Sequence, residues 1–384
     1  MSLSRVAIVL SIVAALDGGL HYFIWARLVR DPELGPPYAR VALGVLLLFA
    51  LLIPLAFILG RVLPHSITSP LFWLVYVWLG LAFFLFVLLL PAEGVRLVAR
   101  LVSRPVDPER RVFLSRTLAT LVGAGALVTS GAALFHGLRD VPLKRVRIPL
   151  AKLPKALSGY TIVQLTDIHV GPTIGRAFIE QLVERTNALR PDLVAITGDL
   201  VDGSVEQLGS FVEPLRKLRA RDGVFFVTGN HEYYSGADEW IAHLGTLGIR
   251  VLRNERISLR GDEGLDIAGV DDASASQFGG DHGMDVGKAL RDRDASRVLV
   301  LLAHQPKAIF AAARGAVDVQ LSGHTHGGQM FPFNYFVKLD QPYVSGLHAH
   351  EKTMIYVSQG TGYWGPPMRL GAPPEITVIE LVSV

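Results

Sequence analysis

Residues 161–169 read Thr-Ile-Val-Gln-Leu-Thr-Asp-Ile-His, a short apolar run that ends in an aspartate and a histidine. Four further islands of polar residues follow: 198–202 (Gly-Asp-Leu-Val-Asp), 229–232 (Gly-Asn-His-Glu), His304, and 323–329 (Gly-His-Thr-His-Gly-Gly-Gln). Each island comes directly after a short β-like apolar run. Because α/β sheets build their sites at the carboxyl ends of strands, we expect these islands to lie close together.

The islands supply oxygen and nitrogen donors but no thiolate, because the chain contains no cysteine. The donors are Asp167, His169, Asp199, Asn230, His304, His324 and His326. This mixed set suits Mn, Fe, Zn, Co or Ni better than Ca, which prefers oxygen cages. Seven donors are too many for one ion that keeps an open position, but they suit two divalent ions about 3.5–4 Å apart that share Asp199. The two aspartates leave roughly half of the ions' charge uncompensated, which attracts phosphate and acidifies a metal-bound water.

Taken in order, the motifs resemble those of the calcineurin-like metallophosphoesterase superfamily. They read Asp-x-His, Gly-Asp-x-x-Asp, Gly-Asn-His-Glu, His and Gly-His-x-His, and the resemblance covers about residues 145–384. It is closest to the bacterial branch whose catalytic domain follows membrane helices or a twin-arginine signal. The resemblance implies an α/β fold, a sandwich of two mixed sheets flanked by helices, with the dimetal site at one edge.

The resemblance also implies a role for each motif residue. Asp167, His169, Asp199 and His326 are expected to bind the first metal, and Asp199, Asn230, His304 and His324 the second. His231 resembles the superfamily's catalytic histidine, which protonates the leaving-group oxygen or stabilises charge on phosphorus. Asp202 is expected to orient its imidazole, whereas Glu232 is expected to be a structural hydrogen-bond acceptor. The implied reaction is in-line attack by a metal-bridging hydroxide on a phosphoester or pyrophosphate phosphorus.

The beginning of the chain has a different composition from the rest. Half of the 384 residues are hydrophobic and the mean hydropathy is +0.38, with the excess concentrated before about residue 138. Apolar runs at about 6–28, 41–60 and 70–91 can each span a bilayer, which needs roughly 20 helical residues. A weaker run at about 117–137 is either a fourth span or a buried soluble helix. We expect a membrane domain at 1–140, with about four transmembrane helices, and a catalytic domain at 141–384.

Arginines between the apolar runs orient them by the positive-inside rule. The loop after the first span carries Arg27, Arg30 and Arg40, the next carries Arg61, and six arginines, Arg104 among them, lie between residues 96 and 116. This pattern, with a fourth span, predicts a multi-pass protein of the bacterial inner membrane whose catalytic domain is extracytoplasmic. Without the fourth span the domain would be cytoplasmic. Residues 110–114 (Arg-Arg-Val-Phe-Leu) also resemble a twin-arginine export signal, although ordinary positive-inside arginines explain them equally well.

Strand-like runs alternate with helical patterns from residue 160 onward, which argues for much parallel pairing. Helices are expected at about 174–189, 205–219 and 236–247. The later strands are closely spaced, which indicates antiparallel additions and a second sheet. These strands are expected near 250–253, 265–270, 297–303, 317–321, 353–358 and 375–382.

These expectations combine into a membrane-anchored dimetal phosphohydrolase that cleaves phosphodiesters or pyrophosphates, with a lipid-linked substrate suggested by the tether. A phosphomonoesterase or a nuclease of the same superfamily is the alternative, but no basic stripe with interleaved aromatics favours nucleic acid. An inactive metal-binding sensor or scaffold is disfavoured by the His231–Asp202 pair. A transport protein with a regulatory phosphoesterase domain is disfavoured because its spans hold few ionisable groups.

Overall fold

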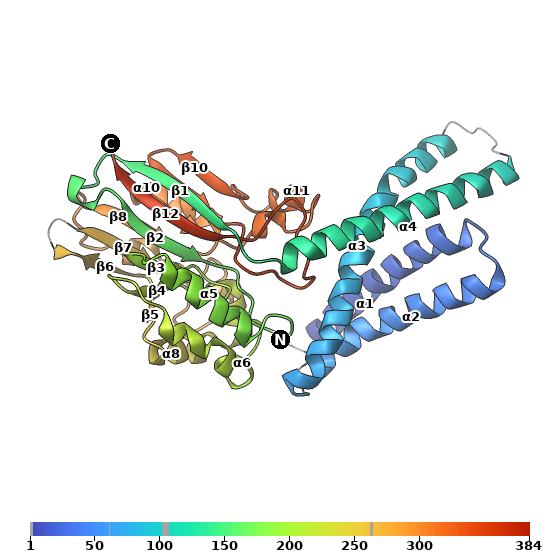
Figure 1. Cartoon of the computed structure of the whole chain (residues 1–384), viewed down its shortest axis with the longest axis horizontal. Coiled ribbons are helices and arrows are strands. Elements are labelled where there is room, and N and C mark those ends of the chain that lie inside the picture. Colours follow the sequence, from blue (N-terminus) through green and yellow to red (C-terminus); the bar gives the residue numbers. More distant parts are fainter. Residues whose placement is uncertain (1–2, 61, 102–106, 262–263) are drawn as a thin grey trace. The chain divides into compact units, whose positions relative to one another are not determined.

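Figure 1 shows the computed structural model of the chain, which describes residues 3–60, 62–101, 107–261 and 264–384. Arg61 and Arg104, used above to orient the helices, lie outside the described residues. The chain divides into a helical unit and a sheet unit. The helical unit comprises Met1–Phe135 and Gly365–Met368, and the sheet unit comprises His136–Trp364 and Arg369–Val384.

Four long apolar helices make up most of the helical unit: α1 (Leu3–Trp25), α2 (Pro36–Leu59), α3 (His65–Leu101) and α4 (Pro108–Leu138). Within the described residues, α2, α3 and α4 each contain a segment that is long and apolar enough to cross a membrane, and a fourth such segment, Ser11–Arg30, extends α1 by five residues. The weak fourth run of the sequence is therefore part of one helix of 31 residues. Its length and composition favour a span over a short soluble helix.

Charged residues near the carboxyl end of α1 and in α3 form a compact ion-pair cluster. Arg27 contacts Glu93 (Nε–Oε1, 2.6 Å) and Asp31 (Nη1–Oδ2, 2.8 Å). Arg96 Nη1 contacts Glu93 Oε1 at 3.0 Å and Asp31 Oδ2 at 3.1 Å. Arg30 Nη2 also contacts Asp31 Oδ1 at 3.0 Å, so three arginines share two carboxylates and every member has an oppositely charged partner.

The sheet unit contains two six-stranded sheets, with strand orders β1-β12-β2-β3-β4-β5 and β10-β11-β9-β8-β7-β6. Inner neighbours in both sheets are largely parallel, while β6 and β10 add antiparallel edges and β12 runs parallel to β1 and antiparallel to β2. The first sheet consists of β1 (Leu143–Leu150), β2 (Tyr160–Leu165), β3 (Leu193–Ile196), β4 (Val224–Phe226), β5 (Arg250–Val251) and β12 (Ile376–Ser383). The second consists of β6 (Glu255–Leu259), β7 (Leu265–Gly269), β8 (Val298–Leu302), β9 (Val319–Ser322), β10 (Gly346–His350) and β11 (Thr353–Val357).

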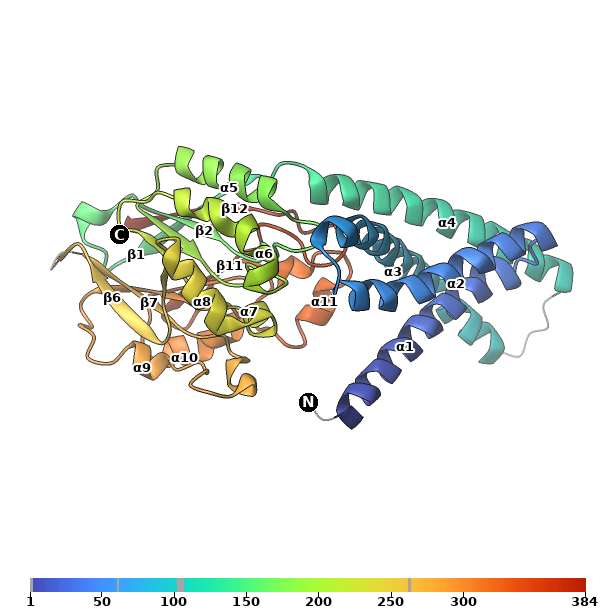
Figure 2. The same cartoon turned by 90° about the horizontal axis from the view of Figure 1, so that it is seen from below.

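The two sheets pack face to face and helices cover their outer faces. The inner core joins Ile162 and Leu193 of the first sheet to Val300 and Leu321 of the second. Helices α5 (Arg176–Ala188), α6 (Val205–Val212) and α8 (Ala237–Thr246) pack on the first sheet, and α9 (Val286–Ala289) and α10 (Ile309–Arg314) on the second. Figure 2 shows α5 and α10 on opposite sides of the strands. The predicted sandwich of two mixed sheets flanked by helices is confirmed.

Some elements differ from the expectation. The helix expected at 205–219 ends at Val212, because Pro214 lacks the N–H that an α-helix requires, and continues as a 3₁₀ turn (Glu213–Lys217). The edge strands β6 and β10 were not expected, since neither buries one clear face. The short helices α7 (Asn230–Ser235) and α11 (Asn334–Val337) were also not expected, because they are shorter than the window that reveals helical periodicity.

Candidate metal centre

All five polar islands lie at carboxyl ends of strands, three in the first sheet and two in the second. Asp167 and His169 follow β2, Asp199 follows β3, and Asn230 and His231 begin α7 after β4. In the second sheet, His304 follows β8, and His324 and His326 follow β9. Since the sheets pack face to face, these strand ends meet at one edge of the sandwich.

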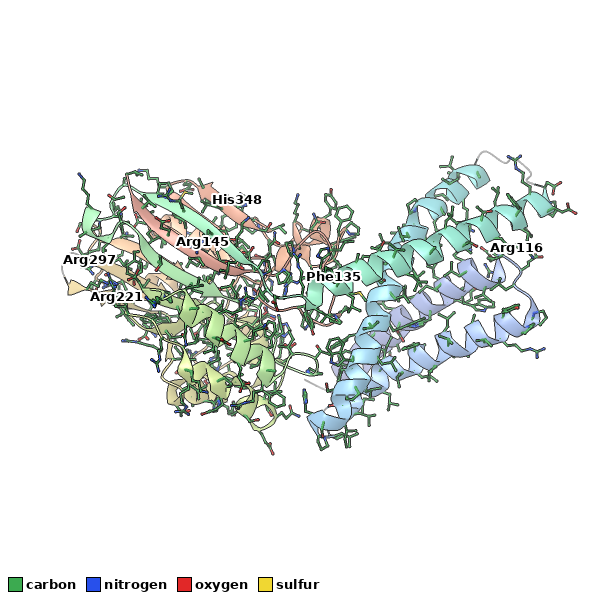
Figure 3. All side chains as sticks on the ribbon, viewed as in Figure 1. Arg116, Phe135, Arg145, Arg221, Arg297 and His348 are labelled. Atoms are coloured by element: carbon green, nitrogen blue, oxygen red, sulfur yellow. The ribbon has the colours of Figure 1, made fainter. Side chains whose placement is uncertain are left out.

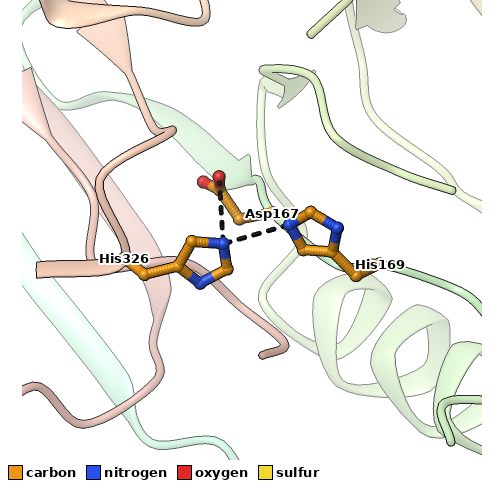
Figure 4. A group of neighbouring side chains, drawn as sticks. All are labelled: Asp167, His169 and His326. Atoms are coloured by element: carbon orange, nitrogen blue, oxygen red, sulfur yellow. Dashed lines mark hydrogen bonds and ion pairs between the residues drawn. The ribbon is translucent and has the colours of Figure 1, made fainter. Parts of the chain in front are cut away.

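The first donor group consists of Asp167, His169 and His326, which are all buried (Figure 4). His326 Nε2 lies 3.6 Å from Asp167 Oδ1 and 3.0 Å from His169 Nε2. The carboxylate of Asp167 is fixed from the other side by the His324 amide, which donates to both of its oxygens at 2.8 and 3.0 Å. The group thus presents one carboxylate and two imidazoles to a common point.

The second donor group consists of Asp199, His304 and His324. His304 Nε2 lies 3.1 Å from Asp199 Oδ2 and 3.2 Å from His324 Nδ1. Asp199 Oδ2 is also 3.8 Å from His169 Nε2, a member of the first group. Asp199 therefore lies between the two groups, where a shared ligand would have to be.

The hydrogen-bond pattern of these residues fits bound cations. His169 Nδ1 lies 3.0 Å from Asp202 Oδ1, and His304 Nδ1 lies 2.8 Å from the carbonyl of Thr197. A ring that donates from Nδ1 to oxygen keeps a lone pair on Nε2, which is the atom turned toward the site in both rings. Within the described residues, the buried Oδ1 of Asn230 also has no hydrogen-bond partner. Two divalent ions would satisfy these lone pairs, so the residues present fit the metals that the sequence implies.

The pKa values of His304 and His324, which belong to the same donor group, are shifted in opposite directions. Burial and the charge of His304 lower the pKa of His324 to about 3, which keeps this ring in the neutral form that binds metals. Burial lowers the pKa of His304, but the charge of Asp199 outweighs it and holds that pKa well above its usual range. His304 must therefore release a proton when it binds a metal.

Backbone strain is concentrated at the donors. Five of them adopt left-handed conformations: Asp167 (φ 51°), His169 (φ 55°), Asp199 (φ 52°), His324 (φ 72°) and His326 (φ 50°). Each such residue costs roughly 1–2 kcal/mol, and strain of this kind gathers at functional sites. Close approach requires glycine nearby, since a Cβ at Gly323 would overlap the carboxylate of Asp167. The conformations that direct these side chains toward one another therefore lower the stability of the fold.

His231 and Asp202 form the expected pair, with Nδ1 and Oδ1 2.6 Å apart. Burial lowers the pKa of His231, but the charge of Asp199 and the hydrogen bond to Asp202 raise it to about 9. Burial raises the pKa of Asp202, but His169 and His231 together lower it to about 2. His231 lies close enough to His169 and Asp199 to form a third donor group with them. However, neither four-residue donor set expected from the sequence includes His231, and its hydrogen bond to Asp202 is the arrangement expected for the acid.

Asp202 has a second contact that the sequence did not predict. Its Oδ1 accepts hydrogen bonds from both His231 and His169, so one oxygen orients the proposed acid and a proposed ligand together. No spacing rule reports this, because the two histidines lie on opposite sides of Asp202 in sequence and in different islands.

Glu232 ties three of the site's loops together. Its Oε2 accepts from the amides of Gly229 (2.6 Å) and Asp199 (3.0 Å), and its Oε1 accepts from Leu200 (2.8 Å). Burial and the charge of Asp199 raise the pKa of Glu232 to about 7. With its oxygens engaged by backbone donors, Glu232 serves as the structural acceptor that the sequence led us to expect.

Arg369 is a further buried residue at the site and lies outside the five polar islands. Its Nη1 donates to the carbonyls of His326 (2.8 Å) and Gln359 (2.7 Å). Its Nη2 donates to the carbonyl of Gly362 and lies 3.1 Å from His326 Nδ1. Burial lowers the pKa of Arg369 to about 10. Among the described residues no carboxylate forms an ion pair with it, so its hydrogen bonds serve mainly to fix the backbone around His326.

Comparison with known proteins identifies similar chains. A family model described as calcineurin-like phosphoesterase matches residues 160–328, which include all seven proposed donors, His231 and Asp202. A transmembrane protein with metallophosphoesterase domain from Danio rerio is 38% identical over 331 residues, covering 83% of this chain and 74% of that protein. An uncharacterized metallophosphoesterase from Helicobacter pylori is 42% identical over 277 residues, covering 72% of this chain and 73% of that protein.

A dimetal phosphatase from Danio rerio is among the solved structures that align. It is 12% identical with a TM-score of 0.37, and the alignment covers 53% of this chain and 88% of that chain. The four apolar helices, together with the relative that is named a transmembrane protein, support a membrane location.

Proposed function

Because the chain belongs to the calcineurin-like metallophosphoesterase family and is a metal-dependent phosphoesterase, we propose that it is a membrane-anchored dimetal phosphohydrolase that cleaves phosphodiester or pyrophosphate bonds. The observation that carries this proposal is the position of Asp199 between two groups of metal-binding side chains.

The first ion would be held by Asp167, His169, Asp199 and His326, and the second by Asp199, Asn230, His304 and His324. Bound divalent ions would supply the positive charge that orients phosphoryl oxygens and lowers the pKa of an attacking water. The protein's own residues fix the geometry. Glu232 holds the loop of Asp199 to the start of α7, and Arg369 holds the backbone of His326.

His231 is proposed as the acid that protonates the leaving-group oxygen. Its pKa of about 9 keeps it protonated at neutral pH, and its side chain is only partly buried, so a substrate can reach Nε2. Asp202 holds Nδ1 and so directs Nε2 toward the donors. Tyr234 and Trp364 stand edge-on to the ring, with centroids 5.3 and 5.6 Å away, and both are exposed. These aromatic rings would flank an organic leaving group.

A preference for diesters or pyrophosphates rests on the balance of positive charge. A monoester dianion calls for an additional cation, such as an arginine clamp on the terminal oxygens. Arg369 cannot fill that role, because its Nη atoms are engaged by backbone carbonyls. A phosphodiester and each phosphorus of a pyrophosphate substituted at both ends carry a single negative charge, and both have a second group on phosphorus that needs space.

A cavity of about 530 Å³, which none of the proposed donors lines, could receive that second group. Its lining includes Gly327, which directly follows His326, and the polar side chains Asn334, Lys338, His348 and Gln359; Figure 3 labels His348. Within the described residues, the buried amide oxygens of Asn334 and Gln359 have no hydrogen-bond partner. A hydroxyl-bearing or amine-bearing group would satisfy them.

The proposed location is the inner membrane of a bacterium, with the catalytic domain outside the cytoplasm. Arginines in the first and third loops and a span in α4 support this orientation. A tethered catalytic domain encounters membrane-borne molecules most often, which supports a lipid-linked substrate.

The test uses the full-length protein, loaded with Mn²⁺ and assayed on a panel of phosphate esters. We expect hydrolysis of bis-(p-nitrophenyl) phosphate and of a lipid pyrophosphate at higher kcat/KM than p-nitrophenyl phosphate. Asp199→Asn is the control for metal dependence. Stoichiometric metal binding without hydrolysis of any member would instead favour the sensor or scaffold. Faster cleavage of the monoester would overturn the proposed bond preference.

A further inference from the structure

Residues 331–339 form an exposed aromatic segment that reads Phe-Pro-Phe-Asn-Tyr-Phe-Val-Lys-Leu. It contains α11, labelled in Figure 1, which has no buried residue among its four described positions. Five apolar side chains of the segment are between 49% and 85% exposed: Phe331, Phe333, Tyr335, Phe336 and Leu339. Soluble proteins rarely leave so many large apolar side chains together in water, and such groups mark interaction surfaces.

The aromatic segment rests on a rigid base. Gly328 approaches the backbone of Asn334 so closely that a Cβ at Gly328 would overlap it. Phe331 N donates to the carbonyl of Leu370 at 2.9 Å, and Phe333 N donates to the carbonyl of Met330 at 2.9 Å. The backbone of the segment is therefore held in a fixed conformation, which keeps its exposed side chains on the surface of the sheet unit.

The composition of the segment matches a lipid interface. Lys338 Nζ lies 5.5 Å from the centre of the Tyr335 ring, so a cation accompanies the exposed rings. Aromatic side chains with a neighbouring lysine are typical of surfaces that enter the headgroup region, where the rings are partly dehydrated and the ammonium meets anionic phosphate. A protein partner would more often require a larger apolar core with a polar rim.

The chain itself keeps a bilayer within reach. Its four apolar helices support a membrane location, and only residues 139–142 separate the end of α4 from the start of β1. Four residues extend at most about 14 Å. A bilayer is thus a permanent neighbour of the sheet unit, whereas a soluble partner would have to be recruited.

We propose that the aromatic segment is a membrane-docking surface that inserts Phe333, Phe336 and Leu339 into the headgroup region of the bilayer that carries the helices. This inference does not depend on the bond that the enzyme cleaves. The docking surface begins five residues after His326, so docking would bring the metal centre to lipid-borne phosphate.

Single-cysteine labelling tests the proposal cleanly, because the chain contains no cysteine. Full-length Phe336→Cys carries an environment-sensitive nitrobenzoxadiazole label in nanodiscs of phosphatidylcholine and phosphatidylglycerol, with or without doxyl-labelled lipid. Phe310→Cys is the matched control, since Phe310 is an exposed phenylalanine of α10 in the same unit. We expect doxyl lipid to quench the label at 336 roughly threefold more strongly than the label at 310.

A second position and a charge variant keep the test decisive. Leu339→Cys, at the most exposed side chain of the segment, should be quenched as strongly as Phe336→Cys if both positions enter the bilayer. Lys338→Glu in the Phe336→Cys background should weaken the quenching in anionic nanodiscs. Equal quenching at 310, 336 and 339 would overturn the proposal. So would protection of 336 from aqueous iodide without quenching by doxyl lipid, because that outcome assigns the surface to a second copy or another protein.

Discussion

Ionisable residues gather in both units, but the two gatherings differ in how their charges are balanced. The cluster of the helical unit consists of Arg27, Arg30, Asp31, Glu93 and Arg96, and every cation in it contacts a carboxylate at 2.6–3.1 Å. At the metal centre, His169 and His326 instead present nitrogen to nitrogen at 3.0 Å, and Asn230 Oδ1 lacks a partner among the described residues. The first cluster is complete in itself, whereas the second is completed by cations.

The difference separates a structural role from a chemical one. A cluster in which every charged group has an oppositely charged partner stabilises helix packing and gains nothing from a ligand. An unbalanced cluster with shifted pKa values is a candidate site, since its groups retain capacity for binding. Substitutions at the metal centre should therefore change metal content and kcat, whereas substitutions in the ion-pair cluster should change thermal stability.

The largest effect is expected for Asp199→Asn, which removes the carboxylate that lies between both donor groups. Metal content, measured by elemental analysis of the purified protein, should fall below one ion per chain. Hydrolysis of bis-(p-nitrophenyl) phosphate should fall by roughly 10⁴-fold or more, as expected when a metal-activated nucleophile is lost. A variant that kept two ions would show that Asp199 is not shared.

His231→Ala should keep both metals and lose turnover. Removal of a general acid typically lowers kcat by about 10²–10⁴-fold. Both proposed donor sets remain intact in this variant, because neither includes His231. Metal content and kcat measured on the same preparation distinguish the two roles, because only the loss of a ligand lowers metal content. Loss of metal together with activity would move His231 into the ligand set.

Asp202→Asn should combine a smaller loss of activity with a shift in pH dependence. The negative charge of Asp202 helps to raise the pKa of His231 to about 9, so His231 is protonated below that pH and loses its proton above it. Without this charge the pKa falls toward its usual value, and the alkaline limb of kcat/KM should move to lower pH. Because Asp202 also orients His169, metal affinity should weaken by roughly 10–100-fold. An unchanged alkaline limb would mean that another group sets it.

Glu93→Gln, in the ion-pair cluster of the helical unit, should give the smallest effect. It removes a charge that contacts both Arg27 and Arg96, and we expect a loss of about 1 kcal/mol in the stability of the helical unit. Thermal unfolding of the detergent-solubilised protein measures the loss, while metal content and kcat should not change. Altered metal binding in Glu93→Gln would contradict the separation of the two clusters.

The sequence predicted which polar islands meet because one rule, polar residues at the carboxyl ends of parallel strands, governs all five. It also predicted the second sheet and the covering helices α5 and α8 from periodicity. It did not predict β6 and β10, whose side chains are half-buried on both faces and so leave no alternating pattern. The partners of Arg369 could not be predicted, because they are backbone carbonyls, which no side-chain motif records.

Left-handed backbone at the donors could not be predicted for a similar reason. Aspartate and histidine adopt positive φ only where surrounding contacts enforce it, and those contacts come from distant segments. At Asp167 they include the amide of His324, more than 150 residues away. Local propensity therefore identifies the residues of the site but not the geometry that makes them bind.

Strand β12 holds β1, the strand that follows α4 along the chain, in the first sheet. In the described structure β1 pairs with β12 alone, through an eight-residue parallel register from Leu143–Ile376 to Leu150–Ser383, and β12 in turn pairs with β2. Pulling on the connection from α4 would load that parallel ladder in shear before it loads any strand that carries a donor. A chain that ended before Ile376 would keep every proposed donor residue. However, β1 would lose its pairing strand, and α4 would then be joined to the rest of the sheet only through the segment that contains β1.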